Sequence, residues 1–218
     1  MASKPNGAII WEGRSRYDGR PMAAIVTWKS ENGKTGDMAQ VWFIPKAPTS
    51  EIKSVCGKCP LSGACYVVMY QGPLGVWKAY RAGRYPKWDR LPINKPVRIG
   101  AWGDPGSIPE DILEFIISRC SHGHTMYTHS HHTLGRLSPT LVNYGMISVE
   151  TKEQATKYQS LGYRTFRVTK HGDSLLKGEI WCSYPKVQCR GCLLCGNRGK
   201  KSIAIPVHGY RAGNFKEG

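Results

Sequence analysis

The chain has 218 residues, 40% of them hydrophobic, so it can bury one substantial core and is too apolar to be disordered throughout. Lys and Arg outnumber Asp and Glu by 31 to 15, and the formal charge of +16 favours nucleic acid as a partner. No apolar run approaches the ~18 residues of a membrane span, and the N-terminus lacks the apolar core of a signal peptide. We therefore expect an intracellular, cytoplasmic protein with no membrane partner and with reduced thiols.

The first 37 residues predict an N-terminal β-hairpin extension. Residues 7–11 and 22–28 have the composition of strands, and Asp18 and Gly19 form the turn between them. A Gly-Lys-Thr triplet at residues 33–35 is similar to part of a phosphate-binding loop, but Trp28 stands where that motif needs its first glycine. We therefore exclude a P-loop.

Strands and helices alternate from residue 38 to residue 185. The six predicted strands cover residues 38–44, 96–102, 124–129, 144–149, 163–168 and 179–182. Helices are predicted between several of them, including one opened at Pro109 and one whose start has a capping box of Thr151 and Gln154. This order predicts an α/β fold with a partial, about six-stranded parallel βα barrel, or alternatively an open doubly wound sheet. Residues 186–218 form a Cys-rich, basic C-terminal segment of the same domain.

Three cysteines, Cys56, Cys59 and Cys65, lie in one short loop after the first strand of this series. A Cys-x2-Cys pair is short enough for both sulfurs to reach one metal, and the turn that follows lets Cys65 close over it. Three thiolates leave a tetrahedral metal, or one iron of a cubane cluster, with a free position, which is typical of a catalytic site. The alternative is a structural zinc loop with a fourth ligand from elsewhere, such as His208 or Cys120.

A second group of four cysteines predicts another metal site near the C-terminus. Its members are Cys182, Cys189, Cys192 and Cys195. Four thiolates close a coordination sphere, so structural zinc and a second iron–sulfur cluster are both open. The compact Cys-x2-Cys-x2-Cys core favours iron–sulfur, whereas the basic residues around it favour a nucleic-acid-binding zinc ribbon. The remaining cysteine, Cys120, lies on a predicted helix and is expected in the core.

Three more candidate site residues, Asp104, His129 and Glu150, follow the ends of predicted strands. Because the carboxyl ends of parallel strands share one edge of a sheet, we expect them near the cysteines. Asp104 would act as a base or hold a ligand's amine or hydroxyl, or it would brace the turn. His129 belongs to a group of five histidines in residues 122–132, which predicts a polar pocket lining or, alternatively, a metal site.

Basic residues mixed with aromatic ones predict a surface that follows phosphates and stacks on bases. The candidate nucleic-acid contacts are Arg81, Arg84, Lys87, Arg190, Arg198, Lys200 and Lys201. The alternative for the first three is a solvated basic face beside a core stripe.

With these residues in place, residues 38–196 resemble a compact radical S-adenosylmethionine (SAM) enzyme of the small kind found in phage genomes. In that family a three-cysteine loop follows the first strand of a partial barrel, and an aromatic residue, here Tyr66, accompanies the last cysteine. A Gly-Gly-Glu-like motif after the second strand contacts the methionine amino group, and Gly103 and Asp104 stand in its place. The resemblance implies a [4Fe–4S] cluster on the first three cysteines, with SAM as cofactor, and an auxiliary cluster at the C-terminal ones. The spacing here is Cys-x2-Cys-x5-Cys, whereas the family's is usually Cys-x3-Cys-x2-Cys.

A second resemblance is to the guanine transglycosylases, which exchange bases in tRNA or phage DNA. It rests on residues 149–153, residues 162–166, the C-terminal cysteines and His208. It implies zinc on those cysteines and acid chemistry at Asp104, although Arg167 stands near the expected place of the nucleophilic aspartate. Three functions are thus open: a radical-SAM-like enzyme that modifies a base of a nucleic acid or nucleotide, a zinc transglycosylase, and a noncatalytic zinc protein that binds DNA or RNA.

Overall fold

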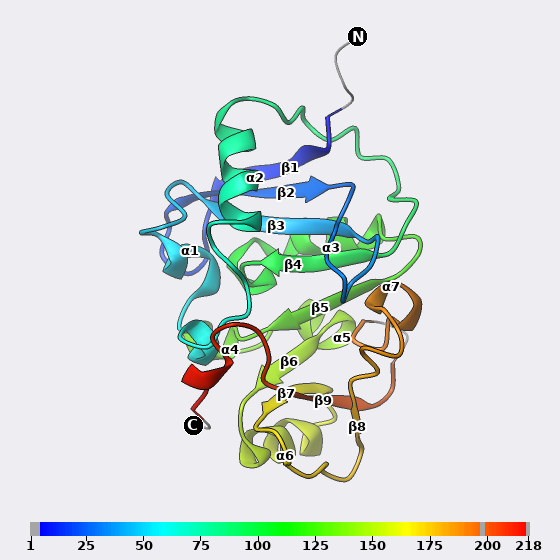
Figure 1. The fold of residues 1–218 in the computed structure, drawn as a ribbon. Helices are drawn as coiled ribbons and strands as arrows, with labels where there is room; N and C mark the ends of the chain where they lie inside the picture. Colours follow the sequence, from blue (N-terminus) through cyan, green and yellow to red (C-terminus); the bar gives the residue numbers. More distant parts are fainter. Residues whose placement is uncertain (1–4, 197–198, 217–218) are drawn as a thin grey trace.

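The computed structural model describes residues 5–196 and 199–216, which are built around a nine-stranded mixed sheet (Figure 1). The strands are β1 (Gly7–Arg14), β2 (Pro21–Thr27), β3 (Ala39–Pro45), β4 (Val97–Trp102), β5 (His124–Thr128), β6 (Met146–Val149), β7 (Thr165–Thr169), β8 (Glu179–Trp181) and β9 (Ser202–Pro206). Their order across the sheet is β1-β2-β3-β4-β5-β6-β7-β9-β8. Strands that follow one another in the chain are thus mostly neighbours in the sheet, as short connections favour.

The direction of pairing changes at β3. The pairings β1–β2 and β2–β3 are antiparallel, and every pairing from β3 to the far edge is parallel. Val26 of β2 lies opposite Val41 of β3, so the predicted N-terminal hairpin extends the same sheet. All residues of β2 after Pro21 are buried, as expected of a strand covered on both faces. The predicted α/β class with parallel strands is confirmed.

All six strands predicted after residue 37 are present, and β9 is an additional one. It lies between β7 and β8, where Ile203 pairs with both Phe166 and Ile180. Its first four residues are buried, because both edges and both faces are covered. Among the described strands, no pairing joins β1 to β8, so the sheet is open at these two edges.

Seven short α-helices accompany the sheet in the described part of the chain. They are α1 (Ile52–Cys56), α2 (Gly72–Arg81), α3 (Glu110–Ser118), α4 (His131–Leu134), α5 (Pro139–Tyr144), α6 (Lys152–Ser160) and α7 (Cys189–Cys192). The predicted cap of α6 is present, because the Thr151 hydroxyl accepts a hydrogen bond from the Gln154 backbone N–H. None of these helices has both the length and the hydropathy needed to cross a membrane.

The main core joins the central strands to α3. Ile25, Phe43, Ile99 and Ile116 are fully buried in it, and each such side chain contributes about 1.5–3 kcal/mol on burial. Helix α3 lies behind the sheet in Figure 1, while the C-terminal segment (red) passes in front. That segment contacts the cysteine loop, because Asn214 Nδ2 donates to a loop carbonyl at 3.3 Å. In Figure 1 α2 lies in front of β2 and β3, whereas loops and the C-terminal segment cross in front of the strands that follow.

Candidate active site

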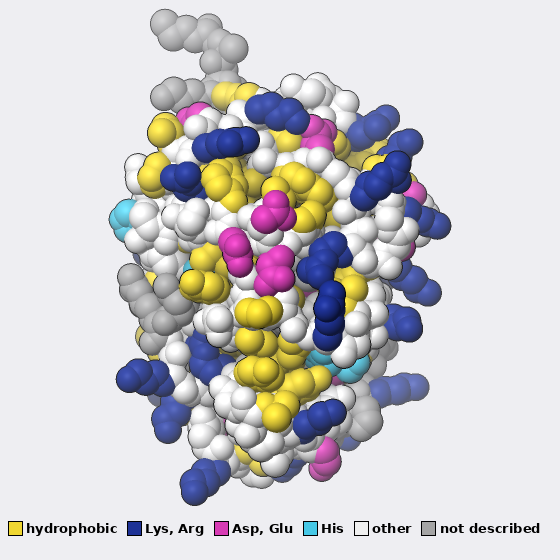
Figure 2. All heavy atoms as spheres, turned by 180° about the vertical axis from the view of Figure 1, so that it is seen from behind, with side chains coloured by type: hydrophobic (Ala, Val, Ile, Leu, Met, Phe, Trp, Pro, Cys, Tyr) yellow, Lys and Arg dark blue, Asp and Glu magenta, His cyan; other side chains and the backbone are white. Residues whose placement is uncertain are grey.

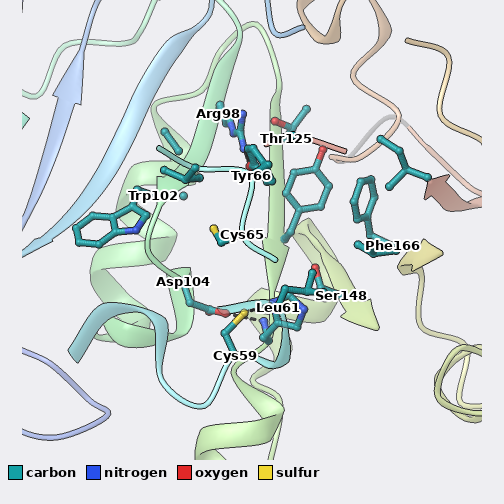
Figure 3. Close-up of a pocket in the computed structure, with 18 of the residues that line it drawn as sticks. Cys59, Leu61, Cys65, Tyr66, Arg98, Trp102, Asp104, Thr125, Ser148 and Phe166 are labelled. Carbon is teal, nitrogen blue, oxygen red and sulfur yellow. Dashed lines mark hydrogen bonds between the residues drawn. The ribbon is translucent and has the colours of Figure 1, made fainter. Parts of the chain in front are cut away.

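A cavity of about 350 Å³ lies on the front face of the parallel strands. Thr125, Tyr127 and His129 line it together, because alternate residues of a strand point to the same side of a sheet. Residues of β4, β6, β7 and β9 line it in the same way. In Figure 3 Arg98 lies near one end of the group of lining side chains and Cys59 lies near the other.

All three cysteines of the early loop line this cavity. Helix α1 ends at Cys56, and Gly57 turns the chain with a φ of +57°. A 3₁₀ turn at Pro60–Ser62 then brings the chain back so that Cys65 faces the same space. Burial raises the pKa of the Cys56 thiol well above its ordinary value, and the nearby Cys59 and Cys65 raise it further. The structure thus brings these three predicted ligands together.

The cysteines are not arranged around a point. Within the described residues, no group of three or more His, Cys, Asp or Glu side chains could hold a single metal ion. A preformed tetrahedral zinc site would need its sulfurs ~2.3 Å from one common centre. What the loop provides is three partly buried cysteines that line one cavity.

The two candidates for a fourth ligand lie in different places. His208 lines the cavity, where its ring stacks on Tyr66 with centroids 5.6 Å apart and its Nε2 lies 3.1 Å from Lys34 Nζ. Cys120 packs against the main core, and its thiol donates to the Ile116 carbonyl at 3.2 Å. Burial raises the pKa of Cys120 to about 12. Cys120 therefore occupies the core position expected of it and does not line the cavity.

Gly103 holds the cysteine loop against the end of β4. Its φ is +84°, and a Cβ atom there would lie 2.7 Å from Phe43 Cβ and 3.2 Å from Val55 Cβ. A hydrogen bond from its backbone N–H lowers the pKa of Cys56, against the larger effect of burial. A glycine is required here because a side chain has neither the space nor the backbone conformation.

Asp104 is buried, and both oxygens of its carboxylate accept hydrogen bonds within the protein. Oδ1 accepts hydrogen bonds from the Gly106 N–H at 2.8 Å and the Thr128 hydroxyl at 2.7 Å. Oδ2 accepts one from the His129 N–H at 2.5 Å, and the Asp104 N–H donates to the Val55 carbonyl at 2.6 Å. These contacts tie the end of β4 to the end of β5 and to the cysteine loop. They match the bracing role that the sequence left open for Asp104.

His129 connects the cysteine loop to Glu150. Its Nδ1 lies 3.6 Å from Cys59 Sγ, and its Nε2 lies 2.7 Å from Glu150 Oε1. Burial by itself lowers the pKa of His129, but Cys59 and Glu150 outweigh it and raise the pKa well above its ordinary value. Glu150 is 2% exposed, and its other oxygen has no hydrogen-bond partner and lies 3.9 Å from His132 Nε2. The predicted residues His129 and Glu150 thus form one buried polar group beside Cys59.

The four C-terminal cysteines line a second, smaller cavity, together with Lys34 and Tyr127. Helix α7 supplies Cys189 and Cys192, and Cys189 also faces the main cavity. Burial raises the pKa of Cys195 to about 12, a hydrogen bond from Tyr127 lowers it, and the other three cysteines raise it. The structure therefore brings this predicted set together at the end of the main cavity opposite the early loop.

The predicted basic contacts do not form one surface. Arg81, Arg84, Lys87, Arg190, Lys200 and Lys201 are exposed, whereas Arg198 lies outside the described residues. Lys87 sits beside β1 and pairs with Glu12, while Lys200 and Lys201 lead into β9 near the other edge of the sheet. In Figure 2, which shows the back of the molecule, Lys and Arg lie mostly around the rim, and acidic side chains gather nearer the middle. That face has no continuous basic patch.

Two cationic residues that were not predicted as site residues, Arg98 and Lys34, line the cavity, and Lys34 belongs to the Gly-Lys-Thr triplet that was excluded as a P-loop. Arg98 is the only charged residue in the otherwise apolar β4, two residues before Gly100 and four before Trp102. All three face the cavity. This two-residue spacing, which places Arg98 on the same face of a predicted strand as Gly100 and Trp102, is the signal that could have identified it from sequence.

Comparison with known proteins gives no match, since no protein-family model, curated protein or solved structure is significantly similar to this chain. The fold and the site define an α/β protein with a mixed sheet and a cavity lined by cysteines at both ends. Its function has to be argued from the chemistry of that cavity.

Proposed function

We propose that the chain is an iron–sulfur enzyme of the radical-SAM kind that modifies a nucleotide or a nucleic acid base. The observation that supports this is the place of the loop of residues 56–65. It follows β3, the first of the parallel strands, and sets three cysteines on the wall of a cavity that also contains Asp104 and His129. Sheets of this kind bind ligands beyond the carboxyl ends of their strands. In this proposal the parallel strands curve as a partial barrel around the substrate.

The donor set fits a cluster better than a single ion. A cubane cluster is larger than one metal ion and holds its thiolates further apart, which suits three cysteines that line one cavity without forming a site for a single ion in the described residues. Cys56, Cys59 and Cys65 would hold three irons and leave the fourth open. When bound, such a cluster would hold SAM and supply the electron for its cleavage. Burial raises the pKa of both Cys56 and Cys65, so metal binding there would have to displace their thiol protons.

The remaining residues position the loop and the ligand. Gly103 lets the chain after β4 approach the cysteine loop, and its backbone is the candidate contact for the cofactor's polar groups. Asp104 holds that turn in place through the three hydrogen bonds that its carboxylate accepts. Tyr66 follows Cys65 in the loop and also lines the cavity. His129 and Glu150 form the polar wall next to Cys59.

The second group of cysteines would hold a structural zinc or an auxiliary cluster. Its four sulfurs line a cavity of about 20 Å³, which leaves no space for a substrate. A closed site of this kind stabilises the segment that carries it. Metal analysis separates zinc from iron here.

The transglycosylase alternative is less well supported. Arg167, near the place of that family's nucleophile, is fully buried and paired with Glu179 and Asp173. Asp104 spends both carboxylate oxygens on internal donors, which leaves little capacity for acid chemistry.

The test is anaerobic purification and reconstitution with iron and sulfide. We expect brown protein with broad absorbance near ~400 nm that dithionite bleaches. Addition of SAM and dithionite is expected to yield 5′-deoxyadenosine. Cys56→Ala, Cys59→Ala and Cys65→Ala should each abolish this product and lose about four irons per chain. Cys120→Ala, which changes a cysteine outside the cavity, is the matched control and should retain both.

Colourless protein that contains only zinc would remove the iron–sulfur proposal and leave the noncatalytic zinc protein. Iron bound without any SAM cleavage would retain the metal site and reject the radical reaction.

A further inference from the structure

One end of the cavity contains a buried guanidinium that lacks a counter-charge. Arg98 is 7% exposed, points into the cavity from β4 and donates to the Tyr66 hydroxyl, but its Nε has no hydrogen-bond partner. No Asp or Glu in the described part of the chain forms an ion pair with it. A buried charge is costly unless it is paired, so a bound anion would complete this site.

Lys34 supplies a second positive charge at the same end. Its Nζ lies 3.1 Å from Nε2 of His208, and across residues 5–196 and 199–216 it forms no ion pair with a carboxylate. The imidazole of His208 carries no negative charge in either protonation state, so this contact does not neutralise Lys34. Burial lowers the pKa of Lys34, Cys182 and Cys189 raise it, and repulsion from the nearby Arg98 lowers it. An anion held between them would remove that repulsion.

Aromatic rings flank the two cations. Tyr66 and His208 are stacked, with an interplanar angle of 19°, on one wall of the cavity. Tyr127 and Phe166, with centroids 4.4 Å apart, lie on the strands of the opposite wall. In Figure 3 Tyr66 lies beside Arg98, and Phe166 lies across the cavity from them. Rings of this kind stack on nucleobases whatever the base is.

We propose that this end of the cavity binds the phosphate of a nucleoside monophosphate, with Arg98 as the principal contact and Lys34 as the second. A guanidinium matches a phosphate because it can donate two parallel hydrogen bonds. The whole cavity has a volume of about 350 Å³, at the lower end of the roughly 300–1,000 Å³ that holds drug-sized ligands, so it has no space for a polymer. The inference rests on the proposed function for the reaction, and it narrows the substrate to a free mononucleotide.

The C-terminal cysteines are the competing partner for these charges. Burial raises the pKa of Cys189, and Arg98 and Lys34 lower it, so both cations lie near that sulfur. If they only balance metal-bound thiolates, their removal should reduce metal binding and leave nucleotide binding unchanged. The experiment therefore measures the two properties separately.

The experiment compares the binding of the four 2′-deoxynucleoside 5′-monophosphates, their nucleosides and a ten-residue oligonucleotide to the reconstituted full-length protein, by calorimetry. We expect at least one monophosphate to bind tenfold or more tightly than its nucleoside. Arg98→Gln should abolish that difference, Arg98→Lys should retain part of it, and Arg136→Gln, at an exposed arginine, should retain all of it. If Arg98→Gln does not fold, Lys34→Gln serves as the test and should reduce the difference at least threefold.

Equal affinities for nucleoside and monophosphate would overturn the inference. A preference for the monophosphate that persists in both Arg98→Gln and Lys34→Gln, while iron or zinc is lost, would also overturn it. An oligonucleotide that binds more tightly than every monophosphate would overturn it as well. Iron content and 5′-deoxyadenosine are measured on the same samples. Phosphate-dependent binding without an iron cluster would reject the proposed reaction only, and a working cluster without phosphate preference would reject the mononucleotide only.

Discussion

The imidazole of His129 and the carboxylate of Glu150 form a buried pair, with 2.7 Å between Nε2 and Oε1. The other ring nitrogen of His129 lies 3.6 Å from the sulfur of Cys59. The pair therefore joins the cysteine loop, at the end of β3, to the end of β6 across two intervening strands. Such a contact fixes the distance between the metal-binding loop and the polar wall of the cavity.

Replacement of Glu150 by Gln should lower the pKa of His129. In the native protein Cys59 and Glu150 raise this pKa by more than burial lowers it. Without the Glu150 carboxylate, the opposing effect of burial is less fully offset. The measurement is the pH titration of the His129 imidazole by NMR. Glu153→Gln, on the outer side of α6, is the control and should leave the titration unchanged. An unaltered His129 titration in Glu150→Gln would contradict the pairing.

The sequence was sufficient to predict which six segments after residue 37 form strands and that the cysteine loop follows the first of them. Both depend on local patterns, such as the apolar run of β3 and the cap that Thr151 provides for α6. Strand β9 was missed because only its pairing with β7 and β8 gives it a place in the sheet. The short apolar run after Lys200 and Lys201 does not by itself indicate a strand that lies between β7 and β8.

The role of Asp104 could not be derived from its neighbours in the chain alone. Its position at a strand end was predicted, but two of its three donors, Thr128 and His129, come from the next strand. The unpaired state of Arg98 likewise depends on which side chains the fold places around it. Properties that arise from contacts between distant segments need the tertiary structure.

Gly103→Ala should destabilise the protein by about 1–3 kcal/mol, because it adds a Cβ atom at a positive φ against Phe43. The free energy of unfolding from urea titration measures this. Gly63→Ala is a matched control in the same region, since Gly63 has a helical φ of −72° and open space around its Cα. It should change stability by less than about 1 kcal/mol. Equal effects of the two substitutions would show that the turn after β4 tolerates a side chain.

Arg167→Ala should cost about 3–5 kcal/mol, because it leaves the fully buried Glu179 carboxylate without its partner. The double variant Arg167→Met with Glu179→Leu should recover most of that loss, since no unpaired charge then remains. Urea denaturation of both variants is the measurement, and Arg136→Ala, at an exposed position, is the control. A double variant as unstable as Arg167→Ala would assign the loss to packing instead of charge.

Stability should fall in acid in part because of Asp173. Hydrogen bonds from Lys152 and then from Arg167 lower the pKa of this carboxyl in the folded protein, so the unfolded chain takes up the proton first as the pH falls. The contribution is therefore complete above the ordinary aspartate pKa of about 3.9 and is lost progressively below it. Asp173→Asn should reduce the slope of unfolding free energy against pH in that range. Lys152→Met should reduce it as well, because Lys152 has the largest effect on this pKa, and a slope equal to that of the native protein in both variants would contradict the assignment.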